Sequence, residues 1–395
     1  MNLSTFHLFL CIIGYQLFTC LVMLFVGGAA ESQTWTIPYR AFALVISLMV
    51  IFFQIKKHNT IPKEVVVLFI YTFLVLLRFF LDFYLGDASR LYGGAKTRIL
   101  MFIVAMNIIP CIAIVKSISQ ISFGLLLKWL AIALVICNMS QLFSNSFVSL
   151  EELDSRIDSF GLGAIGSGHL GLTGFIIFVY LFLKRKDLKL VRILAIPLAL
   201  LSIYIMLRSG SRGPLLSFII LGLVWFLGVT KHKVIFVIIL LAFMIFSGQI
   251  IDAFMNVLEH VAPFLYARFD SHLGDQFGTR MLHYQRALEA FNVNPLWGSA
   301  FAIYFSNGEI SYAHNIFLDS LMQWGIFGGL LILYIYYVSI RKVIYLIEKR
   351  SILDFCGLLL IQFMGEVLVS SSFYYTPIIA ILITTIFMAK NAEYR

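Results

Sequence analysis

A short glycine-rich turn carries two arginines that are well suited to hold an anion. The segment Leu207 to Pro214 reads LRSGSRGP, so Arg208 and Arg212 are only four residues apart. Glycines let the backbone approach a ligand closely, and Pro214 can open a helix without losing a useful donor. Guanidinium groups beside a helix N-terminus can cradle phosphate. The alternative is an ordinary turn whose arginines extend toward water.

A second basic segment precedes Pro295. From Thr279 to Phe291 the spacing predicts an amphipathic helix with one stripe made of Arg280, either His283 or Tyr284, and Ala287. Arg286 turns elsewhere, and Asn292-Val293-Asn294-Pro295 ends the helix. We expect this helix to lie along the membrane surface, with its basic residues near lipid headgroups.

A polar group follows at Tyr312-Ala313-His314-Asn315, directly before another apolar run. Histidine can act as a base or donate a hydrogen bond at neutral pH, and partial desolvation near a helix N-terminus favours its neutral form. A helix cap made with Asn315 is the alternative. Glu366 lies near the end of a later apolar run without an obvious local partner, and such carboxylates are often functional.

Other chemistry lacks sequence support. The chain contains no CxxC, HExxH or GxxxxGK[ST] motif, and its five cysteines all fall in apolar runs. Cysteines in such runs usually serve as small, buried hydrophobic side chains. We therefore expect no metal site, no cofactor, no disulfide framework and no ATP-driven pump, and we expect no nucleic-acid partner.

The elements that must position these residues are membrane helices. Of 395 residues, 61% are hydrophobic and 12% are charged. The apolar runs are continuous, which favours helices over a β-barrel, and most are long enough to cross a bilayer. The first run lacks the basic start of a signal peptide. We predict an all-α polytopic bundle of about twelve spans, near 5–27, 39–55, 65–86, 99–115, 122–143, 170–183, 193–207, 214–229, 234–251, 315–338, 354–370 and 375–389.

Loop charges give the orientation. The loops on one side of the predicted bundle, together with the C-terminal tail, carry 18 Lys+Arg and 5 Asp+Glu. The loops on the other side and the span interiors carry 11 Lys+Arg and 15 Asp+Glu. The basic set is expected in the cytoplasm, with both termini. The chain then forms one membrane domain, 1–395, with a large periplasmic loop at 250–313 and a smaller one at 144–169. Arg78 and Asp82, four residues apart in one span, are predicted to form an ion pair.

Arginine is the main basic residue in the outward set, meaning the loops and span interiors that are not expected in the cytoplasm. It holds ten arginines and a single lysine, Lys96, whereas the cytoplasmic set holds 13 lysines and five arginines. Lysine suffices to set topology, but the planar arginine fork binds phosphate bidentately and keeps its charge. The bias indicates an anionic ligand on the outer face, although each arginine could instead pair with an acidic residue of the same loops.

The ordered set of these segments resembles the bacterial O-antigen polymerase and O-antigen ligase superfamily. The resemblance covers roughly residues 205 to 330, and the N-terminal half matches only in its hydrophobic spans. The matching pieces are Ser209-Gly-Ser-Arg-Gly213, Arg280 with Ala287 to Phe291, Asn294-Pro-Leu-Trp-Gly298, Ala313-His-Asn-Ile-Phe-Leu318 and Gln323-Trp-Gly-Ile-Phe-Gly328.

The resemblance implies a glycosyltransferase of the bacterial inner membrane. Its donor would be a glycan linked to undecaprenyl diphosphate, transferred at the periplasmic face without nucleotide sugar or metal and with inversion. Arg212 and Arg280 would hold the diphosphate, and His314 would face the acceptor hydroxyl. Further substrate-binding candidates, which come from the residue chemistry above, are Arg208, Arg286, Tyr312, Asn315 and Glu366. Membrane lipids and a chain-length regulator protein are the expected partners.

Three functions remain open at this point. A polymerase joins one lipid-linked chain to another lipid-linked repeat unit, whereas a ligase moves the finished chain to lipid A core. The 38 phenylalanines and the compact size are closer to the polymerases. A flippase for lipid-linked oligosaccharide would also be basic and polytopic, but transporters of that kind usually show internal repeats. No repeat is evident, and the special residues gather at one membrane face, which favours a surface reaction.

Overall fold

The fold is known from a computed structural model, which describes residues 1–26, 32–56, 59–85, 93–142, 162–184, 189–230, 275–305 and 310–389, with a few residues between 255 and 266. The predicted span at 234–251 lies outside the described residues. So do most of the predicted loop 144–169 and much of the predicted loop 250–313.

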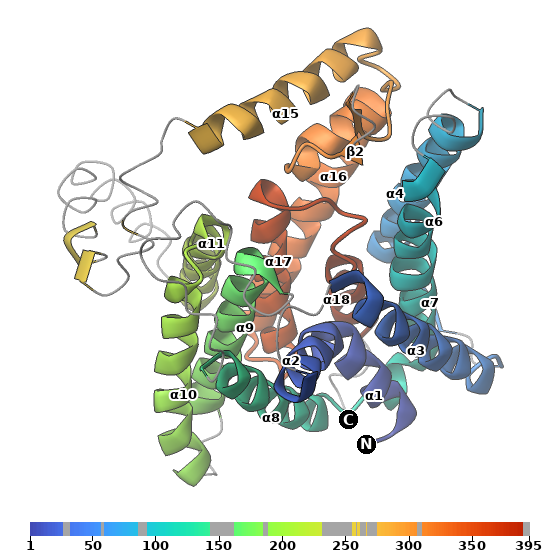
Figure 1. The fold of residues 1–395 in the computed structure, drawn as a ribbon. Coiled ribbons are helices and arrows are strands. Elements are labelled where there is room, and N and C mark those ends of the chain that lie inside the picture. Colours follow the sequence, from blue (N-terminus) through green and yellow to red (C-terminus); the bar gives the residue numbers. More distant parts are fainter. Residues whose placement is uncertain are drawn as a thin grey trace.

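Helices make up nearly all of the described chain (Figure 1). The first half contains α1 (Leu3–Phe9), α2 (Tyr15–Val26), α3 (Ser32–Phe53), α4 (Lys63–Phe80), α6 (Gly93–Met101), α7 (Ile109–Ser117) and α8 (Phe123–Leu142), with π-helical turns at Leu10–Gly14, Leu81–Leu85 and Phe102–Ile108 and a 3-10 turn at Ile118–Gln120. The second half contains α9 (Gly163–Lys184), α10 (Lys189–Arg208), α11 (Arg212–Val229), α15 (Asp275–Val293), α16 (Ile316–Glu348), α17 (Asp354–Val369) and α18 (Ile378–Met388), with a two-stranded antiparallel sheet of β1 (Ile303–Tyr304) and β2 (Ile310–Ser311).

The predicted membrane helix bundle is confirmed. Within the described residues, nine helical segments are long and apolar enough to cross a membrane. The helices α17 and α18 are also apolar but shorter, with 16 and 11 residues. The helix predicted at 170–183 begins earlier, at Gly163, so the last residues of the predicted loop 144–169 are helical.

The shorter helices α17 and α18 form the centre of the bundle. Every residue of α18 is buried, and α17 packs against α9, α11, α16 and α18. Large apolar side chains are exposed instead on peripheral helices such as α3, α4, α10 and α16. Exposed apolar faces of this kind suit a lipid environment, in which only the interior needs close protein packing.

The helix α15 lies across one end of the bundle, whereas α1 lies toward the other end (Figure 1). Along the predicted stripe of α15, Ala287 is only 1% exposed and packs with Ala313 and Met322, whereas Arg280 is exposed. The helix ends at Val293, beside the predicted stop. It is therefore docked on the start of α16.

A break in α16 receives the chain that follows α15. Trp324 and Gly325 have non-helical backbone angles inside α16, and Gly325 has a φ of 58°. The amide of Ile326 donates to the carbonyl of Pro295 at 2.8 Å, and the amide of Ser299 donates to that of Met322 at 2.9 Å. We call this docking of residues 294–299 on residues 322–326 the backbone joint. It satisfies polar groups that the broken helix would otherwise leave without partners.

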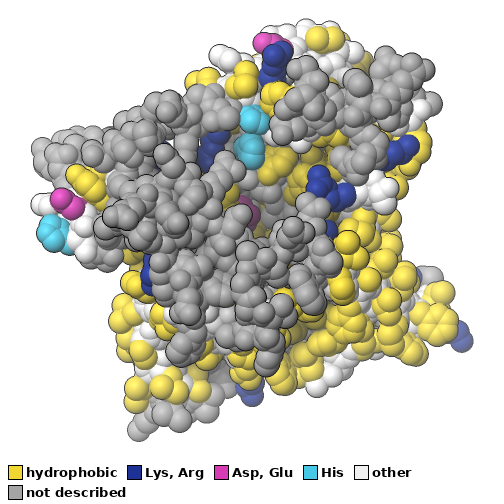
Figure 2. All heavy atoms as spheres, in the orientation of Figure 1, with side chains coloured by type: hydrophobic (Ala, Val, Ile, Leu, Met, Phe, Trp, Pro, Cys, Tyr) yellow, Lys and Arg dark blue, Asp and Glu magenta, His cyan; other side chains and the backbone are white. Residues whose placement is uncertain are grey.

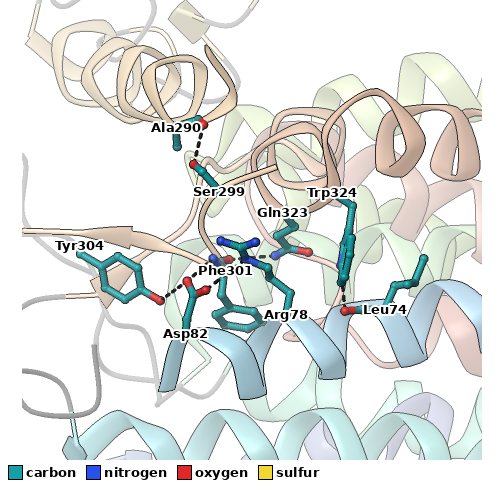
Figure 3. A network of polar contacts seen from close by, with 9 residues as sticks. All are labelled: Leu74, Arg78, Asp82, Ala290, Ser299, Phe301, Tyr304, Gln323 and Trp324. Atoms are coloured by element: carbon teal, nitrogen blue, oxygen red, sulfur yellow. Dashed lines mark hydrogen bonds and ion pairs between the residues drawn. The ribbon is translucent and has the colours of Figure 1, made fainter. Parts of the chain in front are cut away.

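A polar network holds the same region to α4 (Figure 3). The carboxylate of Asp82 forms the predicted ion pair with Arg78, at 3.1 Å, so that prediction is confirmed. Its other oxygen accepts hydrogen bonds from the amide of Phe301, at 2.6 Å, and the hydroxyl of Tyr304, at 2.9 Å. The indole of Trp324 donates to the carbonyl of Leu74 at 2.8 Å. Besides forming an ion pair with Arg78, Asp82 thus binds the segment that contains Phe301 and Tyr304.

We expect Gly325→Ala to destabilise the protein. A β-carbon there would collide with the carbonyl of Pro295, and the positive φ disfavours alanine. Backbone strain of this kind costs about 1–3 kcal/mol, to which the collision adds. Thermal unfolding in detergent should show a lower midpoint than for the wild type. Gly222→Ala is the matched control, because no atom lies within 4 Å of the added carbon there. Equal unfolding midpoints for Gly325→Ala and Gly222→Ala would contradict a stabilising role of the backbone joint.

Candidate functional site

His314 occupies the turn between β2 and α16. Its backbone has a φ of 54°, in the left-handed region that few residues other than glycine, asparagine, aspartate and histidine adopt. The ring is half-buried, and its Nδ1 lies 3.3 Å from the carbonyl oxygen of Ser370, at the end of α17. The ring centroid lies 4.3 Å from that of Tyr312 and 5.2 Å from that of His283 on α15. Three separate segments, the turn itself, the end of α17 and α15, thus surround one imidazole.

Arg212 reaches the same place from α11. It is the first residue of that helix, and the next residue, Gly213, lies against α17: a β-carbon on Gly213 would be 2.8 Å from the hydroxyl of Ser370. The carbonyl of Ser370 faces His314, so the start of α11 and the imidazole meet at one residue. This proximity links two motifs about 100 residues apart in the sequence.

Arg280 completes the group from α15. It is exposed and lies on the same helix as His283, and its positive charge acts on both Arg212 and Tyr312. Burial raises the pKa of Tyr312, while the charge of Arg280 works in the opposite direction. Like charges held close together repel, and an anion between Arg212 and Arg280 would relieve that repulsion. The three residues expected to act in catalysis, His314, Arg212 and Arg280, are therefore brought together.

The face of the molecule drawn in Figure 2 carries positive charge near its α15 end. Figure 2 shows dark-blue Lys and Arg side chains on either side of cyan histidine side chains, near the α15 end of the molecule. A low-dielectric surface lined by one sign of charge concentrates ligands of the opposite sign. The arrangement suits a phosphate-bearing ligand.

Three of the predicted binding residues have structural partners of their own. Arg208 donates to the hydroxyl of Tyr204 at 3.0 Å, one turn earlier in α10. Arg286 is exposed and forms an ion pair with Glu289 at 3.2 Å. Asn315 caps α16: its side-chain oxygen accepts from the amides of Phe317 and Leu318, and its amide donates to the carbonyl of Leu368. The capping alternative raised for Asn315 is thus present, whereas ligand binding by the three stays a prediction.

Glu366 does have a partner, from a helix distant in sequence. Its Oε2 lies 3.8 Å from Nδ1 of His169 on α9, and both side chains are largely buried. The amide of Ser370 donates to the carbonyl of Glu366, so the pair lies one turn below the residue that His314 contacts. A β-carbon on Gly213 would lie 3.8 Å from Nε2 of His169. The His169–Glu366 contact therefore lies beside the start of α11 and the end of α17.

Sequence reasoning missed His169. The available signal was an ionisable side chain, directly after the glycine-rich stretch Gly161 to Gly168, in a helix that is otherwise apolar. A double-mutant cycle with His169→Gln and Glu366→Gln tests the pair through the free energy of unfolding. We expect a coupling of about 0.5 kcal/mol or more, as for residues in contact. Strictly additive effects would show that the two side chains do not interact.

Metal ligation has no visible basis in the described part of the chain. There, no group of three or more His, Cys, Asp and Glu side chains is placed to hold a metal ion. The positive charge of the site instead comes from arginines, which can stabilise a departing phosphate group directly.

Two comparisons with known proteins bear on this site. Residues 197–333 match a family model described as O-antigen ligase. None of the curated proteins compared with the chain matches it. The matched range holds Arg212, Arg280 and His314, together with both sides of the backbone joint, and the family implies a glycosyltransferase-like reaction on lipid-linked glycans. Residues 197–333 of this multi-pass membrane protein therefore carry the domain of the superfamily of O-antigen polymerases and O-antigen ligases.

Proposed function

We propose that the protein is an O-antigen polymerase that joins oligosaccharide repeat units linked to undecaprenyl diphosphate. The observation that carries the proposal is that His314 and the start of α11, where Arg212 is the first residue, both approach Ser370, while Arg280 lies on the helix whose His283 packs against His314. The site would face the periplasm, at the outer surface of the inner membrane, with both chain termini in the cytoplasm. The excess of lysine in the opposite loops supports that orientation.

The proposed reaction is a single displacement at the anomeric carbon of the donor glycan. The acceptor hydroxyl attacks that carbon, the bond to the diphosphate oxygen breaks, and the configuration inverts. His314 takes the proton of the hydroxyl, which a positioned imidazole can do. Arg212 and Arg280 stabilise the negative charge that develops on the leaving undecaprenyl diphosphate. No nucleotide sugar takes part, because the lipid-linked glycan is already activated.

Tyr312 and Glu366 would then have supporting parts. Tyr312 packs against His314, with ring centroids 4.3 Å apart, and offers the acceptor a wall with a polar edge. Glu366 lies below Ser370, where it holds the end of α17 through His169. Arg208 and Arg286, at the rim, would bind sugar or phosphate only after leaving Tyr204 and Glu289.

O-antigen ligase is the second candidate, because the matched family model is described by that activity. A ligase would use the same donor and the same arginines, with lipid A core as the acceptor. The two functions therefore differ in the acceptor rather than in the chemistry of the diphosphate.

A deletion strain tests the proposal through its glycans. Loss of a polymerase leaves lipid A core bearing one repeat unit. Loss of a ligase leaves bare core and accumulated lipid-linked polymer, and loss of a flippase leaves the repeat unit on the cytoplasmic side. Only the first result supports the proposal. The same strain supplies lipid-linked repeat unit for assays with the purified protein, in which chain-length regulators can be added separately.

A further inference from the structure

A second pair of arginines lies outside the site described above. Arg40 on α3 is half-buried, with its guanidinium carbon 4.4 Å from the ring centroid of Phe102. Arg98 on α6 is exposed and lies four residues before Phe102, whose ring centroid is 5.1 Å from that of Tyr375. Arg40 thus packs on a ring only four residues after Arg98, which brings the two positive charges into one region. Both belong to the arginine-rich outward set of the sequence.

These arginines have no acidic counterpart in the part of the chain that the structure describes. There, neither forms an ion pair with aspartate or glutamate, whereas Arg78 and Arg286 each do. Arg40 is the partly buried member of the pair, and partial burial of its guanidinium near a second positive charge is unfavourable unless an anion compensates it. The pair is thus arranged as a receptor for negative charge.

An aromatic run connects this pair to His314. Starting from Phe102, successive ring centroids lie 5.1 Å apart to Tyr375, 5.6 Å apart to Tyr312 and 4.3 Å apart to His314. The start of α11, which carries Arg212, approaches His314 from a different side, at Ser370. Tyrosine rings present an apolar face and a hydroxyl, which suits the mixed surface of a sugar chain. The run can therefore line a path between a second anion site and the reacting group.

We propose that Arg40 and Arg98 bind the diphosphate of the acceptor, the second lipid-linked glycan that a polymerase needs. This inference rests on the proposed polymerase function. The acceptor keeps its own diphosphate while a hydroxyl elsewhere on its glycan attacks the donor. Its diphosphate must then lie apart from the reacting hydroxyl, with the glycan between them. Arg40 and Arg98 hold that diphosphate, Tyr375 and Tyr312 contact the glycan, and His314 receives the hydroxyl.

The same arginines could serve the bilayer itself, because arginines at a membrane edge often contact phospholipid headgroups. The two sources share phosphate chemistry but differ in count and in selectivity. A substrate site should prefer a diphosphate, which offers more oxygens to two arginine forks than a phosphodiester does.

The test counts bound undecaprenyl diphosphate by native mass spectrometry. Full-length protein in detergent is titrated with this lipid and then challenged with phosphatidylglycerol. We expect two equivalents on the wild type, one on Arg40→Gln/Arg98→Gln and one on Arg212→Gln/Arg280→Gln. Lys96→Gln is the matched control and should keep two, because that lysine is on α6 with Arg98 but packs on the ring of Tyr84, 3.1 Å from its centroid.

Two equivalents on Arg40→Gln/Arg98→Gln would overturn the inference, and so would displacement of the second equivalent by phosphatidylglycerol. Two equivalents on Arg212→Gln/Arg280→Gln would instead contradict the donor site, so the two failures are distinguishable. If the glutamine pair does not fold, Arg40→Lys/Arg98→Lys replaces it. The lysine pair keeps the charge but loses the fork, and the dissociation constant of one equivalent should rise at least tenfold. An unchanged constant would overturn the inference.

Discussion

Replacing Arg280 with alanine is expected to slow glycan transfer by a factor of about 100 to 1,000, the usual loss when one group that stabilises a developing anion is removed. The protein should still insert and fold, because Arg280 is exposed and the packing of α15 depends on Ala287. The measurement is the initial rate of polymer formation by purified protein on lipid-linked repeat unit. In cells, the same variant should lose long glycan chains.

Variants of Arg212 and of the uncharged residue Gln285 serve as comparisons in this test. Arg212→Ala should show a similar loss, and the double variant should lose less than the product of the two single effects, because both residues act on one diphosphate. Gln285→Ala, at an exposed position of the same helix, should keep the wild-type rate. Wild-type chain lengths in Arg212→Ala and Arg280→Ala would remove both residues from the site.

His314→Asn is expected to lower the transfer rate by a factor of about 100 to 10,000, the range for loss of a general base. Asparagine is chosen because it tolerates the left-handed backbone that His314 adopts, so the turn before α16 should survive. Binding of undecaprenyl diphosphate should not change, since the diphosphate is held by arginines. Rate and binding are measured on the same preparation.

This variant separates two roles of the histidine. If His314 only orients the acceptor, asparagine can replace a hydrogen-bond donor and much of the rate should remain. Gln285→Ala, at an exposed position of α15, is the control and should keep the wild-type rate. A rate within about fivefold of the wild type for His314→Asn would contradict the base role.

The helix bundle could be predicted from the sequence because lipid imposes a simple rule on length and hydrophobicity. The helix α15 was predictable as well, from the spacing of Arg280 and Ala287 and from the stop before Pro295. Its docking was harder to foresee. The break at Gly325 lies in an apolar run that continues on both sides, and only the segment 294–299 explains it.

The residues of the candidate site that lie in a recognisable motif could be predicted from the sequence. Arg212, Arg280 and His314 lie in segments that resemble the family, whereas the contact of His169 with Glu366 joins helices almost 200 residues apart. The second arginine pair and Tyr375 come from α3, α6 and the turn before α18. Pairing between helices depends on packing, which the composition of each helix alone does not determine.

Because the backbone joint holds one end of α15, a small tilt of the helix would displace residues near its other end. The helix is held at one end by residues 294–299 and along its length by Ala287, and about 10 Å of stiff helix separate Ala287 from Arg280. A tilt of about 10° around Ala287 would therefore move Arg280 by roughly 2 Å, enough to open or close its grip on a diphosphate. If Arg280 binds the donor diphosphate as proposed, its position depends on hydrogen bonds formed at the opposite end of the same helix.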